Sequence, residues 1–370
     1  MAWRHMSVLD PVLQLSADDE YAALEELHEM GCTDGLPVVI PTPERVARMV
    51  LATGYDADLV LGAMGPNMGE CTIEKLACAA VMAGCLPDHA PVVIAAAKAV
   101  LDDRFDLTEM QATTHSIAPL IIVNGPAREW CGGIHGGFGA LGPGYRANAT
   151  IGRALRLAMI NIGGGRSGTS DMALMGHPGK FSMCLAEDQD NSPFAPMHTS
   201  LGFDASQSTV TVLGTDAPHS VIGVIDADDP TAADRLLNSF AKAFANVATN
   251  NVSLRGGQAA LAINADHAGF LAGAGHDLRT IRDQVVERAF ISGSDFAASA
   301  GYMGKPPAAD RQYHCFNDPA DLLVFVAGGG GLYSVAFPTW CAGPHKNRAV
   351  TVEIDVGQAC EIPAFASMRN

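Results

Sequence analysis

The stretch that decides the fold is "PLIIVNGP" at residues 119–126, together with "ANATIGRALRLAMINI" at residues 147–162. The first is an apolar run, rich in β-branched residues, that ends in a Gly-Pro turn, and this pattern is typical of a buried β-strand. The second has apolar residues at helical spacing and predicts an α-helix. A buried strand followed by a helix is typical of α/β proteins.

The same alternation extends along the chain in both directions. Before this stretch we expect a short buried strand at 36–41 and helices at 17–30, 41–54, 72–84 and 87–101. After Ser208 the pattern starts again, and it predicts strands at 208–214, 257–264, 321–331 and 349–356 and helices at 230–248, 266–274 and 277–289.

We therefore predict an α/β fold with mixed or mainly parallel sheets and flanking helices. A boundary near residue 205 would divide the chain into an N-terminal half, 1–205, which carries the glycine-rich loops, and a C-terminal half, 206–370. Both halves contain an apolar strand that runs into a glycine-rich turn, "IIVNGP" and "LVFVAGGGG". The pattern is compatible with two related halves and with one compact unit.

Composition excludes several classes of protein. The chain has 370 residues, 48% of them hydrophobic and 17% charged, and a net charge of -17 that repels nucleic acid and anionic membranes. Residues 1–15 carry no apolar run of signal-peptide length, and no stretch is long and apolar enough to span a membrane. The chain has nine cysteines and no CxxC pair, which indicates that they are reduced thiols. We expect a soluble, cytoplasmic protein.

Three cysteines, Cys71, Cys78 and Cys85, are spaced seven apart. On one straight helix this spacing keeps them on one face but too far apart for a disulfide. Cys85 differs, because it follows Gly84, which ends one helix, and precedes the start of the next, where the helix dipole would lower its pKa. We take Cys85 as a candidate catalytic residue with His115 as its acid or base, the alternative being a buried, inert thiol.

The segment between Gly132 and Gly152 contains eight glycines and runs into a helix. Glycine backbone and a helix start are suited to hold a small anionic group. The substrate-binding candidates here are Gly142, Gly144, Arg146 and Asn148, and Asn124 at the end of the preceding strand is a further one. The segment is neither a Walker loop nor a dinucleotide-binding motif. A purely structural glycine loop is the alternative.

Residues 161–190 combine small and polar residues in a way that suggests the wall of a site. From this segment we select Asp171 and His177 as catalytic candidates and Lys180 and Glu187 as substrate-binding candidates. The histidines are dispersed and form no metal-binding motif, so we expect neither metal nor cofactor. A metal-dependent hydrolase or lyase that uses His177, His115 and nearby carboxylates is the alternative.

The chain resembles a bacterial family over nearly its whole length. The segments that carry the resemblance include "EKLACAAVMAGCLPDHAPVVIAA", "ATTHSIAPLIIVNGP" and "DMALMGHPGKFSMCLAED". That family is associated with, or fused to, small thiol/selenol proteins that carry a Sec/Cys-Gly-Ser-Cys (UGSC) motif. The resemblance implies thiol- or selenol-linked reductive or bond-cleaving chemistry on a small molecule. The family-pattern positions are Cys85, His115, Arg146, Asn148 and Lys180. This chain has no Cys-Gly-Ser-Cys segment, and the resemblance implies a thiol/selenol partner protein.

We expect a cytoplasmic, cofactor-independent hydrolase or lyase that cleaves a carbon–heteroatom bond of a small polar or anionic molecule by cysteine-assisted chemistry. A non-catalytic subunit of a thiol/selenol reductase system is a further alternative. The segment "GGLYSVAFPTWCAG" places Tyr333, Phe337 and Trp340 beside glycines. We expect these aromatic side chains to be exposed and the protein to be a homodimer, with its site near the meeting of the two halves.

Overall fold

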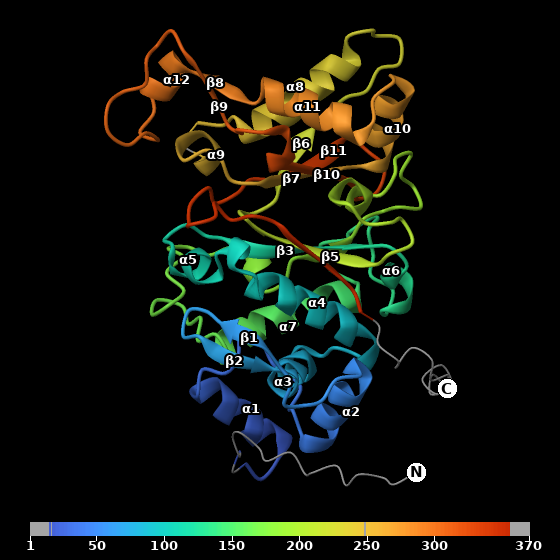
Figure 1. Ribbon diagram of the computed structural model, residues 1–370, viewed down its shortest axis with the longest axis vertical. Helices are drawn as coiled ribbons and strands as arrows, with labels where there is room; N and C mark the ends of the chain where they lie inside the picture. Colours follow the sequence, from blue (N-terminus) through green and yellow to red (C-terminus); the bar gives the residue numbers. More distant parts are fainter. Residues whose placement is uncertain (1–14, 16, 248, 356–370) are drawn as a thin grey trace.

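Two mixed four-stranded sheets lie face to face at the centre of the molecule, and helices cover the outer face of each (Figure 1). This computed structural model describes residue 15 and residues 17–247 and 249–355. The order of layers is helix, sheet, sheet, helix. The predicted α/β class is confirmed, and both sheets are mixed rather than mainly parallel.

The first sheet has the order β12-β5-β3-β4. Its strands are β3 (Ala118–Asn124), β4 (Cys184–Ala186), β5 (Thr209–Thr215) and β12 (Val350–Glu353). Strand β3 pairs antiparallel with β5 and parallel with β4, and every residue of β3 and β5 is buried. The sheet takes β3 and β4 from residues 1–205 and β5 and β12 from residues 206–370, so it crosses the expected boundary between the halves.

The second sheet has the order β10-β7-β11-β6. Its strands are β6 (His219–Ile222), β7 (Ala259–Ile263), β10 (Leu322–Val326) and β11 (Tyr333–Phe337). Strands β7 and β10 are parallel, whereas β11 runs antiparallel to both of its neighbours. Two small hairpin-like pairs complete the strands, β1 (Val60–Met64) with β2 (Gly69–Thr72) and β8 (Phe290–Ser292) with β9 (Gln312–His314).

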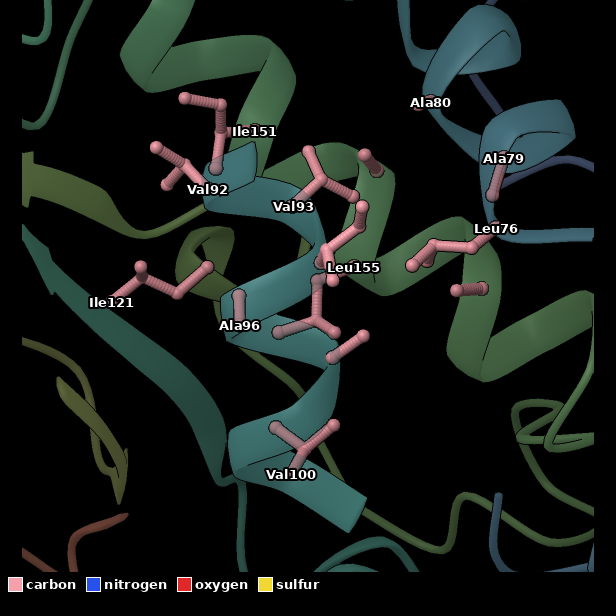
Figure 2. Packing of buried hydrophobic residues seen from close by; sticks show 14 of the residues in the cluster. Leu76, Ala79, Ala80, Val92, Val93, Ala96, Val100, Ile121, Ile151 and Leu155 are labelled. Carbon is pink, nitrogen blue, oxygen red and sulfur yellow. The ribbon is translucent and has the colours of Figure 1, made fainter. Parts of the chain in front are cut away.

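Helices α3 (Ile73–Ala83), α4 (Ala90–Leu101) and α7 (Arg146–Asn161) cover the first sheet. Figure 2 shows Ala96 of α4 beside Ile121 of β3, with Leu155 of α7 on the other side of α4, and α7 also packs directly on β3. The alanines of α4 let these elements approach closely, because they add little side-chain volume. Helices α1 (Glu20–Glu29) and α2 (Pro43–Thr53) pack outside α3.

Helices α8 (Ala232–Phe244), α10 (Ala265–Gly273) and α11 (Leu278–Arg288) cover the second sheet. The remaining helical pieces are short: α5 (Leu107–Ala112), α6 (Ala127–Trp130), α9 (Asn250–Ser253) and α12 (Gly293–Ala297), and single turns at Pro87–His89, Asp103–Phe105, Pro178–Lys180, Met197–Leu201 and Pro319–Asp321. Among the described residues, no helix has both the length and the apolar character needed to cross a membrane.

The strand predicted at residues 36–41 is wrong. This segment is irregular, and the N–H of Val39 donates to the carbonyl of Met82 at the end of α3, at 3.1 Å. Pro37 and Pro41 flank it, and proline has no N–H to give to a strand ladder. Val38 belongs to the core that includes α3, and Ile40 packs against it, whereas Leu36 and Val39 are exposed.

The expected exposure of the aromatic residues is wrong for two of the three. Phe337 is 1% exposed and belongs to the apolar layer between the two sheets, while Trp340 is buried in the core of the first sheet and its helices. Only Tyr333 is exposed, at 58%. The chain crosses from the second sheet to the first just after Phe337, where Thr339 bridges to Thr215 of β5, so the turn is covered by both sheets.

Strand β11 offers a matched test of this layer between the sheets. We expect Phe337→Ala to lower the free energy of unfolding by about 3–5 kcal/mol, because it leaves a cavity between the sheets. Tyr333→Ala, on the exposed end of the same strand, should cost less than about 1 kcal/mol. Denaturant titration of both variants measures the difference, and equal losses would contradict the face-to-face packing of the sheets.

Candidate functional site

A cavity of about 640 Å³ lies beside α7 and under the loop that links α7 to β4. Its walls combine charged and apolar side chains from three parts of the chain: Gly31, Thr33, Asp34, Arg156, Ile160, Gly165, Arg166, Ser167, Asp171, Met175, Gly176, His177, Pro178, Lys180 and Phe181. We call it the α7 cavity. Its volume is typical of small-molecule sites. Three of the candidates taken from residues 161–190 meet here: Asp171, His177 and Lys180.

An ion triad lines the α7 cavity, in which Arg156 and Asp171 are buried and Lys180 is partly buried. Lys180 Nζ donates to both carboxylate oxygens of Asp171, at 2.7 and 2.8 Å, and Arg156 Nη1 donates to one of them at 3.2 Å. Arg156 also donates from Nε to the carbonyl of Lys180, at 2.7 Å. One carboxylate therefore holds two cations, and the triad keeps an excess positive charge.

Local structure explains how the triad is positioned. Arg156 lies in the third turn of α7, on a stretch that is otherwise apolar and buried. Asp171 closes a tight turn, in which its N–H donates to the carbonyl of Arg166 and its carbonyl accepts from Gly168. Lys180 lies in the helical turn Pro178–Lys180. The helix and the loop that follows it therefore bring the three charges together.

Burial and charge act on the pKa values of the triad in opposite directions. Burial lowers the pKa of Lys180, and the nearby Arg156 lowers it further, against the effect of Asp171. Burial also lowers the pKa of Arg156. Burial by itself would raise the pKa of Asp171, but hydrogen bonds and charge from Lys180 and Arg156 hold it below its ordinary value. A lysine with a lowered pKa in a cavity is characteristic of functional sites.

Two further charged residues line the α7 cavity. Asp34 is already paired, because Arg153 donates to it from Nε and Nη2, each at 2.8 Å. Arg166 is exposed and donates from Nη1 to the carbonyl of Met30, at 3.1 Å. The lining thus presents cations that its carboxylates do not fully neutralise. The cavity is suited to an anion, although the chain as a whole carries a net charge of -17.

His177 forms another part of the wall. Its Nδ1 accepts from the N–H of Gly179 at 3.1 Å, which fixes the turn that carries Lys180. Its Nε2 is buried and makes no hydrogen bond, although it lies near the carbonyl of Thr215. Burial lowers the pKa of His177, so the imidazole is neutral at pH 7. Through this Nδ1 contact, His177 helps to position Lys180.

His115 lies behind this wall rather than in it. Its Nε2 is 2.9 Å from Asp216 Oδ2, and its Nδ1 accepts from the side-chain amide of Asn250. Both ring nitrogens are therefore engaged within the protein. Asp216 also interacts electrostatically with His177, so the two histidines selected from the sequence flank one carboxylate.

Cys85 does not line the α7 cavity, and the ring nitrogens of His115 are engaged by Asp216 and Asn250 instead. Cys85 is buried, its thiol donates to the carbonyl of Thr150 at 3.3 Å, and burial raises its pKa to about 12. The expectation of a lowered pKa is wrong, because desolvation of a thiolate outweighs the opposing effects of the Thr150 side chain and of Arg146. At neutral pH the side chain is a protonated thiol.

The glycine-rich loop is organised by its own polar side chains. Arg146 is exposed and donates from Nε and Nη2 to the carbonyl of Gly84, at 3.1 and 2.9 Å, which caps the end of α3. Asn148 is buried, accepts from the N–H of His135 and donates to the carbonyls of His135 and Ala140. These contacts tie the loop to the start of α7, and the α7 cavity does not include them.

Two glycines selected from this loop, Gly142 and Gly144, have open space around them. Their backbones adopt φ values of +102° and +123°, which other residues rarely adopt. The turn therefore requires glycine for its backbone conformation. Neither Gly142 nor Gly144 lines the α7 cavity.

Asn124 and Glu187 form a second buried pair, at the carboxyl ends of β3 and β4. The amide of Asn124 and the N–H of Met197 both donate to Glu187 Oε2, the latter at 2.9 Å. Glu187 Oε1 and Asn124 Oδ1 are buried without a hydrogen-bond partner. Burial raises the pKa of Glu187 to about 7. This pair lies where the two sheets join, because the next residue, Asp188, donates its N–H to the carbonyl of Val326 in β10.

The larger cavity, of about 820 Å³, lies between α1, α2 and α3 and has mainly apolar walls. None of the candidate residues lines it. Within the part of the chain that is described, no three His, Cys, Asp or Glu side chains form a group that could hold a metal ion.

Sequence reasoning missed Arg156 and Asp34 in the α7 cavity. A single arginine within the apolar face of a predicted helix is the signal that could have pointed to Arg156. The chain matches no known family model, and no curated protein is significantly similar to it. The α7 cavity is therefore the basis of the function proposed below.

Glu187 makes stability depend on pH. Its pKa is about 7 in the folded protein and about 4.5 in the unfolded chain, so the folded state binds more protons between these values. The contribution of Glu187 to stability should fall as pH rises from 4.5 to 7, by up to about 3 kcal/mol. Glu187→Gln should remove this slope, and denaturant titrations at several pH values measure it. A variant with the same pH slope as the natural protein would contradict this assignment.

Cys85 should react slowly. In the native protein at neutral pH we expect iodoacetamide to label Cys85 at least about tenfold more slowly than Cys32, which is partly exposed. Mass spectrometry of peptides after timed labelling measures both rates, and labelling in denaturant serves as the control. Equal rates in the native protein would show that Cys85 is an accessible thiolate.

Proposed function

We propose that the protein is an enzyme that binds a small anionic molecule in the α7 cavity and cleaves a carbon–heteroatom bond in it, as a hydrolase or lyase. The observation that carries this proposal is the ion triad, in which Lys180 and Arg156 share one carboxylate inside a cavity of about 640 Å³. Burying several charges costs free energy, so the triad is weak evidence for stability, and perturbed pKa values in a cavity cluster at functional sites.

The charge balance supports an anionic ligand. The guanidinium groups of Arg156 and Arg166 and the ammonium group of Lys180 line one cavity, and Asp34 already pairs with Arg153. Guanidinium groups bind carboxylates and phosphates by paired hydrogen bonds. The chain as a whole carries a net charge of -17, so the cationic lining of the α7 cavity gives an anion a local attraction that the net charge does not.

Lys180 is the proton donor of the proposed reaction. A lysine with a lowered pKa gives up its proton more readily near neutral pH than an exposed lysine. As the carbon–heteroatom bond breaks, its electron pair leaves with the heteroatom, which takes the proton from Lys180. The carbon then either bonds to water, as in a hydrolase, or forms a double bond to its neighbour, as in a lyase. The proton released by the water or by the neighbouring carbon goes to the neutral amine of Lys180, which restores its ammonium form. Asp171 and His177 position Lys180 for this step.

Cys85 and His115 have no part in this proposal, because the Cys85 thiol is protonated and buried and both nitrogens of His115 are engaged. A cytoplasmic location belongs to the proposal. All eight cysteines in the described residues are free, which is consistent with a reducing compartment. A homo-oligomer and a thiol/selenol partner protein remain hypotheses that the geometry of the α7 cavity does not require.

Anion binding tests the proposal directly. We expect methyl phosphate or acetate to bind the natural protein and to bind Lys180→Met at least about tenfold more weakly, since one charge-assisted contact is lost. Affinity should decline as pH rises through the pKa of Lys180, which lies below its ordinary value of 10.5, because the neutral amine no longer attracts the anion. Isothermal titration at several pH values measures both effects.

Two variants serve as controls. Lys180→Arg keeps the positive charge and should keep binding while it shifts the decline to higher pH, since guanidinium stays protonated. Lys305→Met removes an exposed lysine outside the cavity and should leave binding unchanged. The proposal fails if neither anion binds, or if Lys305→Met weakens binding as much as Lys180→Met does.

A further inference from the structure

A group of exposed apolar side chains lies on the loop at residues 172–181, part of which lines the α7 cavity. Leu174 is 85% exposed and Met175 is 92% exposed, and Met172 and Phe181 are exposed as well. We call these four residues the apolar rim. Met175 and Phe181 line the same cavity as the ion triad. Large apolar groups gathered on a surface mark sites of binding.

The exposure of the apolar rim is built into the backbone. The N–H groups of Met172 and Leu174 donate to the carbonyls of Gln111 and Thr114, at 2.9 and 3.0 Å. The N–H of Gly176 donates to the hydroxyl of Ser116 at 2.9 Å. The loop is thus fastened to the segment at residues 111–116, which holds its backbone in place while the side chains of Leu174 and Met175 face solvent.

The α7 cavity therefore has two chemically distinct parts. Its floor holds Lys180, Arg156 and Asp171, and its mouth holds Met175 and Phe181. A carboxylate or phosphate group alone fills only a fraction of about 640 Å³. The remaining volume is bounded on one side by a methionine and a phenylalanine, which contact apolar groups of varied shape.

We infer that the ligand is amphipathic: its anionic group binds the triad, and an apolar group, aliphatic or aromatic, packs against Met175 and Phe181. This inference rests on the proposed anion site and adds the class of ligand to it. A ligand explains the apolar rim better than a second protein chain does, because two of its four residues, Met175 and Phe181, line the charged cavity itself.

Matched pairs of anions test the inference. Acetate is compared with phenylacetate, and methyl phosphate with phenyl phosphate, by isothermal titration, so that each pair shares its anionic group. We expect the phenyl compound of at least one pair to bind at least about tenfold more tightly, because the ring is removed from water. The double variant Met175→Gln, Phe181→Ser should lose most of this gain and keep the affinity for acetate or methyl phosphate.

A matched control comes from a distant methionine. Met303 is 80% exposed on the loop after α12 and does not line the α7 cavity. Met303→Gln should leave every affinity unchanged, whereas Lys180→Met should weaken all four anions. Thermal unfolding of each variant checks that the fold is retained, since the substituted rim residues are exposed and carry little of the core.

The outcomes separate the inference from the proposed function. If none of the four anions binds, the proposed function fails and the inference fails with it. If they bind through Lys180 but the phenyl compounds gain nothing, the anion site stands and the inference is overturned. If the rim variant changes only the particle mass seen in light scattering, the rim is an interface between copies of this chain, which also overturns the inference.

Discussion

The burial of strand β3 on both faces is the constraint on which the rest of the structure depends. All seven of its residues are buried, with Ile121 turned to the helices and Leu120 to the second sheet. A strand of this kind needs an apolar layer on each side. The helices α4 and α7 provide one layer, and the strands of the second sheet provide the other, so the order of layers follows from one strand.

The position of α7 against β3 also determines where the α7 cavity forms. The helix must bury its apolar face, and that face contains Arg156. A buried guanidinium requires a partner, because desolvation of an unpaired charge is costly. Asp171 supplies the negative charge and brings Lys180 with it. The same packing that stabilises the sheet therefore leaves a cationic cavity at its edge, which is the basis of the proposed function.

Part of the candidate site could be predicted from the sequence. Asp171, His177 and Lys180 lie within one segment rich in glycine and polar residues, and short separation along the chain made their proximity foreseeable. Arg156 was missed because its helical pattern reads as packing against the core. The pKa of Cys85 was predicted to be lowered, because the helix-dipole argument left out burial. Desolvation is the larger effect for an enclosed thiol, and it raises this pKa.

The sequence by itself determined the elements: the apolar runs of β3, β5, β7 and β10, and the helices ended by Gly54 and Gly84, because these depend on side-chain period and local backbone conformation. Only the tertiary structure decided which strands pair, that β5 and β12 join the first sheet, and that Phe337 is buried while Met175 is exposed. Those outcomes depend on contacts between residues far apart in the chain, and the desolvation that sets the pKa values of Lys180 and Glu187 exists only after those contacts form.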